Sequence, residues 1–418
     1  MKNQQMSPLK FTDQRSKEAL ENLLGDYTTG HALPRDFYTS DAVYEIDIKQ
    51  YWNKSWIWVG HISQLAQIGD YMVFEYGPES VIIVRDKQDR ILAFQNICRH
   101  RGSRICLKKS GSARVFSCPY HAWTYELNGK LRAAREMGSN FNPENYHLLG
   151  VHLRVFEGLI FICSAENPPA IELGLSKLQP LVAPFQLAKM KIAHSKVYPV
   201  PANWKLALEN YMECYHCAPA HTEYSRSHSL KDPAILTEDL RNVLKVKSQQ
   251  VGIPTLELQI NRLTDEMSDM DFYYSRYPLY PGYLTGSKTG AAVAPLLGRL
   301  GDYDGGTTDI QIGLLNNFLA YSDHVIGYRF VPVAQQETRL EVVWMVHENA
   351  ELGRDYTLKD LTWLWDVTSK DDERIIRLNQ KGVNSHHYLP GPLSQMEWGI
   401  RAFHEVYFSQ IKSSLLSG

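Results

Sequence analysis

The chain has 418 residues, of which 44% are hydrophobic and 22% are charged, and its formal net charge is -2. A chain of this length exceeds one typical hydrophobic core, so the composition favours an ordinary folded protein with two domains. The near-neutral charge excludes a strongly basic protein that binds nucleic acid, and no apolar run reaches the length that a membrane-spanning helix requires.

The N-terminal segment, residues 1–54, is expected to be helical. Its first residues contain neither the apolar core of a signal peptide nor an Arg-rich amphipathic pattern, so we expect a cytoplasmic protein. A short helix is predicted over Arg15 to Leu24. Ser40 and Asp41 offer N-cap chemistry for a second helix that continues through Tyr51.

Residues 55–165 have the pattern of a small all-β domain. The pair Asn128-Gly129 lies in the middle of a β-rich run and indicates a tight hairpin, because this dipeptide accepts the positive φ angles that such turns require. Other β-rich runs, separated by polar turns, predict strands over 71–76, 80–85, 91–95 and 115–117.

Two loops of this β domain carry paired metal-binding side chains. The first loop has Cys98 and His100, and the second has Cys118 and His121. Two thiolates and two imidazoles on adjacent hairpin tips form a donor set that suits a structural zinc ion or an iron–sulfur cluster. Six cysteines are too few to stabilise a chain of this length by disulfides. This fits a reducing compartment, where thiolates are available as metal ligands.

The stretch 203–221 is expected to hold a second metal site. Its apolar pattern predicts an amphipathic helix over residues 204–217. Pro219 lacks a backbone N–H and clashes with the carbonyl four residues back, so we expect it to end the helix near Cys217. Cys214 and Cys217 form a C-x-x-C pattern, which on this helix predicts packing rather than redox chemistry.

Glu213, His216 and His221 are the side chains of this stretch that can act on a metal. Glu213 and His216 share a helix face because they lie three residues apart, and the helix end lets His221 fold back toward His216. Two imidazoles suit zinc, copper, nickel or iron, and two histidines with one distant carboxylate specify oxygen-activating ferrous iron. The alternative is that both histidines are ordinary polar residues near a helix end.

The rest of the chain, residues 166–418, is expected to form a mixed domain. Alternating and β-branched runs predict strands, and long amphipathic runs predict helices. The predicted strands cover 194–200, 325–333 and 339–347, with a hairpin between the last two, and a further strand is predicted over 155–163, at the end of the preceding β domain. The predicted helices cover 358–383 and 395–415.

These motifs together resemble the α subunits of the Rieske non-haem iron oxygenases. The resemblance rests on CRHRG and CPYHAW in the two loops, and on NWKLALENYMECYHCAPAH, in which an acidic residue, two residues, His, four residues and His follow in the family's order. It implies an α+β fold with an all-β Rieske [2Fe–2S] domain, residues 55–165, and a helix-capped antiparallel-sheet catalytic domain, residues 166–418, to which residues 1–54 contribute an N-terminal helical part.

The resemblance also implies the ligands of a Rieske cluster and of a mononuclear iron. Cys98 and Cys118 would bind one iron of the [2Fe–2S] cluster, and the imidazoles of His100 and His121 would bind the other. His216 and His221 would bind the mononuclear Fe(II) together with a distant aspartate.

That aspartate is expected near the start of a C-terminal helix, within family wording like DxxI…NQxG. The matching stretch is 369–382, and counting back from Ile375 places the ligand on Asp372. Asp371 is the alternative, because adjacent acids at a helix start are commonly surface groups that the helix dipole favours.

Glu213 stands where the family has an acidic residue that bridges two subunits. The resemblance implies a homotrimer in which Glu213 hydrogen-bonds His216 and either His100 or His121 of the neighbour. Most members have Asp at this position, which leaves the geometry of the bridge open, and a carboxylate that only orients His216 is compatible with it. Since the chain has no flavin or nicotinamide fingerprint, it needs a separate NAD(P)H-dependent reductase, expected to carry flavin and an iron–sulfur cluster.

The substrate is predicted from a finer resemblance. Wording such as HALPRDFYT and ENYMECYHC resembles the branch that oxidises glycine betaine, stachydrine and carnitine. It implies a terminal monooxygenase that uses O2 to hydroxylate a quaternary ammonium compound, followed by N-demethylation or C–N cleavage. A methylammonium group binds well in an aromatic cage, although a Tyr-rich run also serves packing. The candidate cage residues are Tyr273, Tyr274, Tyr277 and Tyr280.

Other functions remain open from the sequence. Within the same chemistry, the alternative is a ring-hydroxylating dioxygenase that acts on an aromatic substrate in an apolar pocket. From a different class, the alternative is an electron-transfer iron–sulfur protein without oxygenase activity. A structural zinc protein is the last alternative, and it predicts a colourless preparation where a Rieske cluster predicts a red-brown one.

Overall fold

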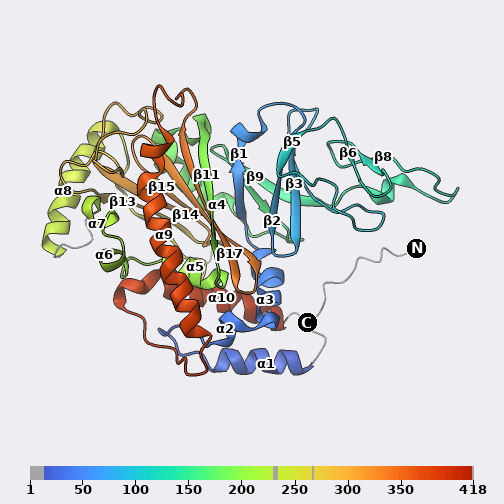
Figure 1. Cartoon of the computed structure of the whole chain (residues 1–418), viewed down its shortest axis with the longest axis horizontal. Coiled ribbons are helices and arrows are strands. Elements are labelled where there is room, and N and C mark those ends of the chain that lie inside the picture. The colour runs from blue at the N-terminus through green and yellow to red at the C-terminus, as the bar shows by residue number, and fades with distance from the viewer. Residues whose placement is uncertain (1–13, 229–233, 266–267, 417–418) are drawn as a thin grey trace.

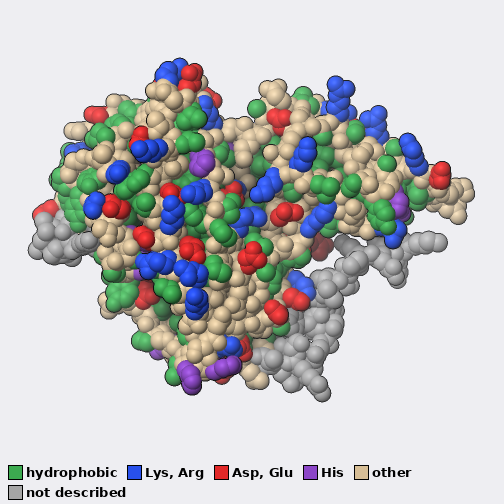
Figure 2. All heavy atoms as spheres, viewed as in Figure 1, with side chains coloured by type: hydrophobic (Ala, Val, Ile, Leu, Met, Phe, Trp, Pro, Cys, Tyr) green, Lys and Arg blue, Asp and Glu red, His purple; other side chains and the backbone are tan. Residues whose placement is uncertain are grey.

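The computed structural model describes residues 14–228, 234–265 and 268–416, so residues 1–13 of the predicted N-terminal segment lie outside it. Figure 1 shows a small all-β part, drawn in blue to cyan, that extends from one side of a larger part in which helices pack on a long twisted sheet. This arrangement confirms the predicted α+β class. Charged side chains of both signs are interspersed over the face drawn in Figure 2.

The small part is built from two antiparallel sheets. The larger has the strand order β1-β10-β9-β4-β3-β2-β5, and the smaller has the order β6-β7-β8. The predicted hairpin at Asn128-Gly129 joins β7 to β8, where Gly129 has a φ angle of 83° and any side chain would meet the ring of Phe94. The strands are β1 (Ile57–His61), β2 (Asp70–Tyr76), β3 (Glu79–Arg85), β4 (Ile91–Gln95), β5 (Ser110–Ser112), β6 (Phe116–Ser117), β7 (Thr124–Tyr125), β8 (Leu131–Ala133), β9 (Gly150–Phe156) and β10 (Leu159–Cys163).

The large part contains one antiparallel sheet of seven strands in the order β11-β17-β16-β15-β14-β13-β12. Its long central hairpin, β16 and β17, confirms the predicted hairpin and pairs Ala334 with Glu337 at its turn. Strands β12 to β15 extend the sheet on one side. The strands are β11 (Met190–Val200), β12 (Leu258–Ile260), β13 (Phe272–Pro278), β14 (Gly306–Ile312), β15 (Asn317–Ala320), β16 (Val325–Ala334) and β17 (Glu337–His347).

Helices cover this sheet and close its edges. The predicted helix 358–383 is confirmed as α9, and Ser40 caps the N-terminal helix as expected, accepting a hydrogen bond from the backbone N–H of Val43 at 3.4 Å. The sequence analysis missed α4 and α8. The helices are α1 (Gln14–Gly25), α2 (Asp36–Thr39), α3 (Asp41–Ile46), a π-helical turn (Asp47–Trp52), α4 (Glu172–Val182), α5 (Trp204–Tyr211), α6 (Cys217–Ala220), α7 (Tyr224–Ser227), α8 (Ala234–Val251), α9 (Leu358–Val383) and α10 (Trp398–Leu416).

A buried polar cluster fixes the start of α5 against the N- and C-terminal segments. The carboxylate of Asp47 accepts hydrogen bonds from the ammonium of Lys205 and the indole N–H of Trp204, the latter at 3.0 Å. It also accepts one from the hydroxyl of Tyr407 on α10 at 2.5 Å. A charge pair without solvent is stabilising only when its remaining hydrogen bonds are made, and these contacts make them. The helix that leads to the candidate metal site is therefore held at its base.

Candidate metal centres

The predicted helix 204–217 is wrong in its length, because α5 ends at Tyr211. The reason lies in Glu213, whose carboxylate accepts hydrogen bonds from the backbone N–H groups of Tyr215 and His216, the second at 3.1 Å. These local bonds replace helical ones and turn the chain. The expected role of Pro219 is also wrong, since Pro219 lies inside the short helix α6 that follows the turn.

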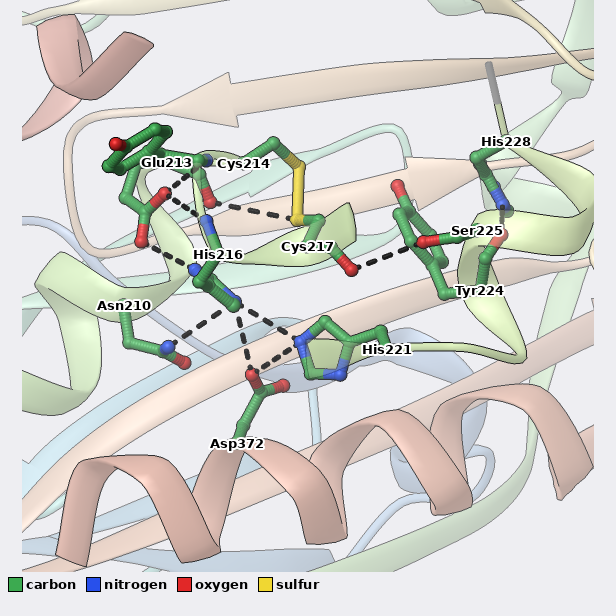
Figure 3. Close-up of a disulfide and its surroundings, with 11 residues drawn as sticks. Asn210, Glu213, Cys214, His216, Cys217, His221, Tyr224, Ser225, His228 and Asp372 are labelled. Carbon is green, nitrogen blue, oxygen red and sulfur yellow. Dashed lines mark hydrogen bonds and ion pairs between the residues drawn. A yellow bond between two sulfur atoms is a disulfide. The ribbon is translucent and has the colours of Figure 1, made fainter. Parts of the chain in front are cut away.

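The structure brings His216, His221 and Asp372 to one point (Figure 3). The Nε2 atoms of the two imidazoles are 3.1 Å apart, and Oδ1 of Asp372 lies 3.4 Å from His216 and 3.0 Å from His221. Ligand atoms on adjacent corners of an octahedron with bonds of about 2.1 Å are separated by about 3 Å. Three lone-pair donors at this spacing fit one face of an octahedral site and leave the opposite face free.

Asp371 and Asp372 take different positions relative to this cluster. Asp372 projects from α9 toward both Nε2 atoms, and its side chain is 17% exposed. Asp371 is 40% exposed, and its Oδ2 lies 3.6 Å from Nδ1, the other ring nitrogen of His221. This separation follows from the helix, where adjacent residues point in directions about 100° apart. The geometry favours Asp372 as the third ligand and leaves Asp371 beside the back of the imidazole.

Glu213 holds the other nitrogen of His216. Its Oε1 contacts Nδ1 of the imidazole while its Oε2 caps the turn, so the ring cannot rotate freely. Burial opposes a charged imidazole, yet hydrogen bonds with Asp372 and Glu213 raise the pKa of His216 to about 9.

The second donor set lies on the two loops of the small β part. The thiols of Cys98 and Cys118 are free and buried, whereas His100 and His121 are exposed. The two imidazole rings are 4.6 Å apart between centroids, and the hydroxyl of Tyr125 lies 3.4 Å from Sγ of Cys98. Two inner thiols and two outer imidazoles fit the ligation of a cluster whose histidine-bound iron lies nearer the surface.

Backbone hydrogen bonds shape both loops in the same way. In the first loop, the N–H of Gly102 bonds to the carbonyl of Cys98 at 3.0 Å, and in the second, the N–H of Ala122 bonds to the carbonyl of Cys118 at 3.0 Å. Gly102 and Ala122 both have positive φ angles, 77° and 55°. Each loop therefore folds back over its cysteine, which brings the following histidine to the tip.

A cavity of about 110 Å³ opens beside the three converging ligands. Four aromatic side chains form much of its wall: Tyr211, Tyr224, Tyr328 and Trp365. The ring centroids of Tyr211 and Tyr328 are 4.8 Å apart, and those of Tyr224 and Trp365 are 5.4 Å apart. Asp309 also lines the cavity, and sequence reasoning missed both this carboxylate and the aromatic wall because they come from five separate elements.

The predicted cage of tyrosines lies elsewhere. Tyr274 points to the opposite face of the sheet, where its hydroxyl bonds to the carbonyl of Pro254 at 2.8 Å, so its predicted role is wrong. Tyr273 and Tyr277 share the face of the cavity and hydrogen-bond each other, but neither lines it, and nor does Tyr280. A run of tyrosines along one strand alternates between faces, which is why the run could not form one cage.

Cys214 and Cys217 form a disulfide, which corrects the prediction that this pair only packs as thiols. Figure 3 shows it on the side of the turn away from Asp372. The C-x-x-C spacing was the signal for this bond. Cys214 and Cys217 are therefore not available as thiolates, whereas the other four cysteines are free.

Two family models match most of the chain. A Rieske [2Fe–2S] domain model matches residues 55–156, and a model of the ring hydroxylating alpha subunit (catalytic domain) matches residues 187–283 and 316–413. The first match covers both cysteine–histidine loops, and the second covers all three converging ligands. Among the described residues, no helix is both long and apolar enough to cross a membrane.

Known proteins agree with these matches along nearly the whole chain. The glycine betaine monooxygenase oxygenase subunit of Pseudomonas aeruginosa (strain UCBPP-PA14) is 31% identical over 410 residues, covering 96% of this chain and 94% of the relative. A crystal structure of the quaternary ammonium Rieske monooxygenase CntA with L-carnitine is similar at a TM-score of 0.67 and 25% identity, covering 94% of this chain and 98% of CntA. Another CntA structure, described as giving insights into inter-subunit electron transfer, has a TM-score of 0.68, 26% identity and the same coverage.

Proposed function

Because this chain belongs to the Rieske non-haem iron oxygenases, we propose that it is a terminal oxygenase that hydroxylates a quaternary ammonium compound of betaine type. The observation that carries the proposal is the cavity in which three converging ligands lie beside an aromatic wall and the partly buried carboxylate of Asp309. The substrate named for the relatives, glycine betaine or carnitine, carries the permanent positive charge that such a cavity suits.

The residues that would hold the two metal groups fit them. Cys98, Cys118, His100 and His121 supply the two thiols and two imidazoles of a Rieske cluster. The three converging side chains, His216, His221 and Asp372, supply a facial set for mononuclear iron. When bound, the cluster supplies electrons one at a time and the mononuclear iron supplies the activation of O2.

The chain's own part in catalysis is to position the substrate and to exclude water. The side chains of Tyr211, Tyr224, Tyr328 and Trp365 line the cavity; Tyr328 and Trp365 are buried, and Tyr211 and Tyr224 are partly buried. Ring faces attract a cationic methyl group electrostatically, and they offer it no hydrogen bond that would compete with this placement. A methyl carbon is thereby held beside the ligand triad without a hydrogen bond to it.

The proposed reaction balances with a supply of two electrons. O2, two electrons and two protons convert an N-methyl group into an N-hydroxymethyl group and one water. The N-hydroxymethyl ammonium then loses formaldehyde and a proton, leaving the tertiary amine, which is N-demethylation. Hydroxylation of the carbon beside nitrogen on a longer chain instead breaks the C–N bond and releases trimethylamine.

The electrons come from a partner protein and cross between subunits. We infer a separate NAD(P)H-dependent reductase with flavin and an iron–sulfur cluster, and a homotrimer in the cytoplasm. Within one subunit, Glu213 already contacts Nδ1 of His216. The proposed bridge needs its carboxylate to meet His100 or His121 of the neighbouring subunit as well, which suits their exposure on the loop tips.

An aromatic substrate is the second candidate. The same aromatic wall would accept a planar ring, and the catalytic-domain model carries the description of ring hydroxylation. The carboxylate of Asp309 favours a cation over an uncharged arene, since a buried charge next to an apolar ligand has nothing to compensate it. We therefore rank the quaternary ammonium substrate first.

The test is reductase-coupled O2 uptake by the iron-loaded protein across a panel of betaines, carnitines and aromatic acids, with formaldehyde and trimethylamine assayed separately. Uptake that forms formaldehyde from a betaine supports N-demethylation, and trimethylamine supports C–N cleavage. If only aromatic acids stimulate coupled uptake, the proposed substrate is wrong while the oxygenase chemistry remains.

A further inference from the structure

Asp309 lies on the face of the large sheet that the cavity occupies. It belongs to β14, whose even-numbered neighbours Ile310 and Ile312 pack into the core on the opposite face. Since side chains alternate along a strand, Asp309 points the other way, and it lines the cavity together with Leu319, its partner on β15. Its carboxylate and the ligand triad thus share one cavity.

This carboxylate lacks a partner within the described part of the chain. The structure gives the partly buried Asp309 no hydrogen bond and no ion pair, whereas the buried carboxylates of Asp304 and Asp323 are hydrogen-bonded. Four tyrosines lie near it instead: Tyr211, Tyr224, Tyr273 and Tyr277. Burial raises the pKa of each of these hydroxyls, and the negative charge of Asp309 raises it further. An ionised group in such surroundings is costly unless a cation neutralises it.

No arginine or lysine lines the cavity among the described residues, so the chain itself supplies no such cation there. The same cavity has the aromatic wall that suits a methylated ammonium group. A quaternary nitrogen carries no N–H and cannot hydrogen-bond a carboxylate, but the two opposite charges attract through space, and more strongly in a partly buried cavity than in bulk water. An unpaired anion and an aromatic wall in one cavity are complementary to one permanent cation.

We propose that Asp309 is the counter-ion of the substrate's quaternary ammonium group and selects a cation over an uncharged molecule of the same shape. The inference rests on the proposed function, because it names the residue that recognises the charge of that substrate. Asp309 acts on binding and orientation, and it takes no part in the bond changes.

The experiment compares a cation with its carbon isostere, in which a quaternary carbon replaces the nitrogen. Glycine betaine and 3,3-dimethylbutanoate form one such pair, and choline and 3,3-dimethylbutanol form another. Binding is measured by calorimetry on the oxidised, iron-loaded protein without reductase. The wild type is expected to bind each cation more tightly than its isostere. Asp309→Asn should lower the preference for the cation over its isostere by about 30- to 100-fold, and it should leave binding of the uncharged 3,3-dimethylbutanol nearly unchanged.

Two further variants keep the test specific. Asp309→Glu retains the charge and should keep the preference for the cation, while Asp302→Asn removes an exposed carboxylate just before β14 and should behave as wild type. Thermal unfolding of Asp309→Asn checks its folding, and Asp309→Ser offers a smaller neutral side chain if the amide is not tolerated.

The outcomes separate this inference from the proposed function. If Asp309→Asn or Asp309→Ser folds and prefers the cation as strongly as the wild type, Asp309 is not the counter-ion, although the proposed function stands. If the wild type binds and oxidises no quaternary ammonium compound, the proposed function fails and the inference fails with it.

Discussion

The two candidate metal centres differ in where their ligands come from and how deeply they lie. The cysteine–histidine pairs sit on two loops of one small β part, and His100 and His121 at their tips are exposed. In the triad, His216 and His221 lie in the segment that follows α5, and Asp372 lies on α9. His221 is only 2% exposed. An exposed centre suits exchange of electrons with another protein, whereas an interior centre beside a cavity suits a bound substrate. The exposed centre is therefore suited to receive electrons, and the interior centre is suited to the reaction with substrate.

The strongest test of this separation removes the interior centre alone. Asp372→Asn is expected to abolish coupled O2 uptake, because it takes away the anionic member of the triad. The visible spectrum of the Rieske cluster should stay unchanged, since that centre lies in the other part of the molecule. The measurement combines turnover, iron content and absorbance.

Asp371→Asn is the matched control, because it makes the same change one residue away. Asp371 lies beside Nδ1 of His221 at 3.6 Å, and we expect at most a loss of about 10- to 100-fold, as for groups that orient a ligand. Equal losses in both variants would contradict the assignment of Asp372 as the ligand.

The converse test removes the exposed centre. Cys98→Ser should eliminate the cluster spectrum and the bound sulfide, and with them all reductase-driven turnover, while one iron per chain remains at the triad. Cys106→Ser serves as control, since Cys106 is a free cysteine of the same β part that belongs to neither cysteine–histidine pair. Loss of the cluster in both variants would show that the spectrum does not report on the predicted loops.

A third change addresses the connection between the centres. Glu213→Gln keeps the shape of the side chain but removes the charge that contacts Nδ1 of His216. We expect turnover to fall by about 10- to 100-fold with cluster and iron contents retained. Stopped-flow oxidation of the pre-reduced cluster by O2 in the presence of substrate should slow by the same factor. An unchanged rate of cluster oxidation would mean that Glu213 only shapes the turn.

The same contrast explains what the sequence could predict. The ligands of the small β part are neighbours in sequence, so their spacing and wording identify them without knowledge of the fold. His216 and His221 are also close together in the sequence. Asp372 is far from them in the sequence, and only the fold brings it to the site, so it was predicted from a motif shared with a family. Helix α5 was predicted too long because propensity carries no information on the hydrogen bonds of Glu213 to the following backbone.

The walls of the cavity were the least predictable part. Tyr211, Tyr224, Tyr328 and Trp365 come from α5, α7, β16 and α9, and no spacing in sequence links them. The predicted tyrosines 273–280 were chosen because they cluster in sequence, yet they lie along β13 and its end, where alternate residues face opposite sides. Helix α4 was missed for a local reason, since Gly174 and Pro180 within it are poor helix formers.

The mildest expected effect is a dependence of cation binding on pH, and it would sharpen the assignment of the interior cavity. Burial raises the pKa of Asp309 to about 7. The carboxylate is neutral below this pH and charged above it, so cation binding should strengthen as the pH rises. At pH 6 roughly one tenth of the groups are ionised, and the Kd of the cation should be about tenfold higher than at pH 8.

The tyrosines near Asp309 do not titrate in this pH range, so they do not contribute to the expected pH dependence of cation binding. Burial raises the pKa of each of its neighbours Tyr211, Tyr224, Tyr273 and Tyr277, so all four stay neutral between pH 6 and pH 8. Glu213 and Asp372 line the same cavity, so calorimetry on the iron-loaded protein compares wild type with Asp309→Asn to separate the titration of Asp309 from theirs. Asp309→Asn should show a flat profile over this range. A wild-type profile that is equally flat would mean that the carboxylate is already charged at pH 6, and a slope that survives in Asp309→Asn would assign the titration to another group.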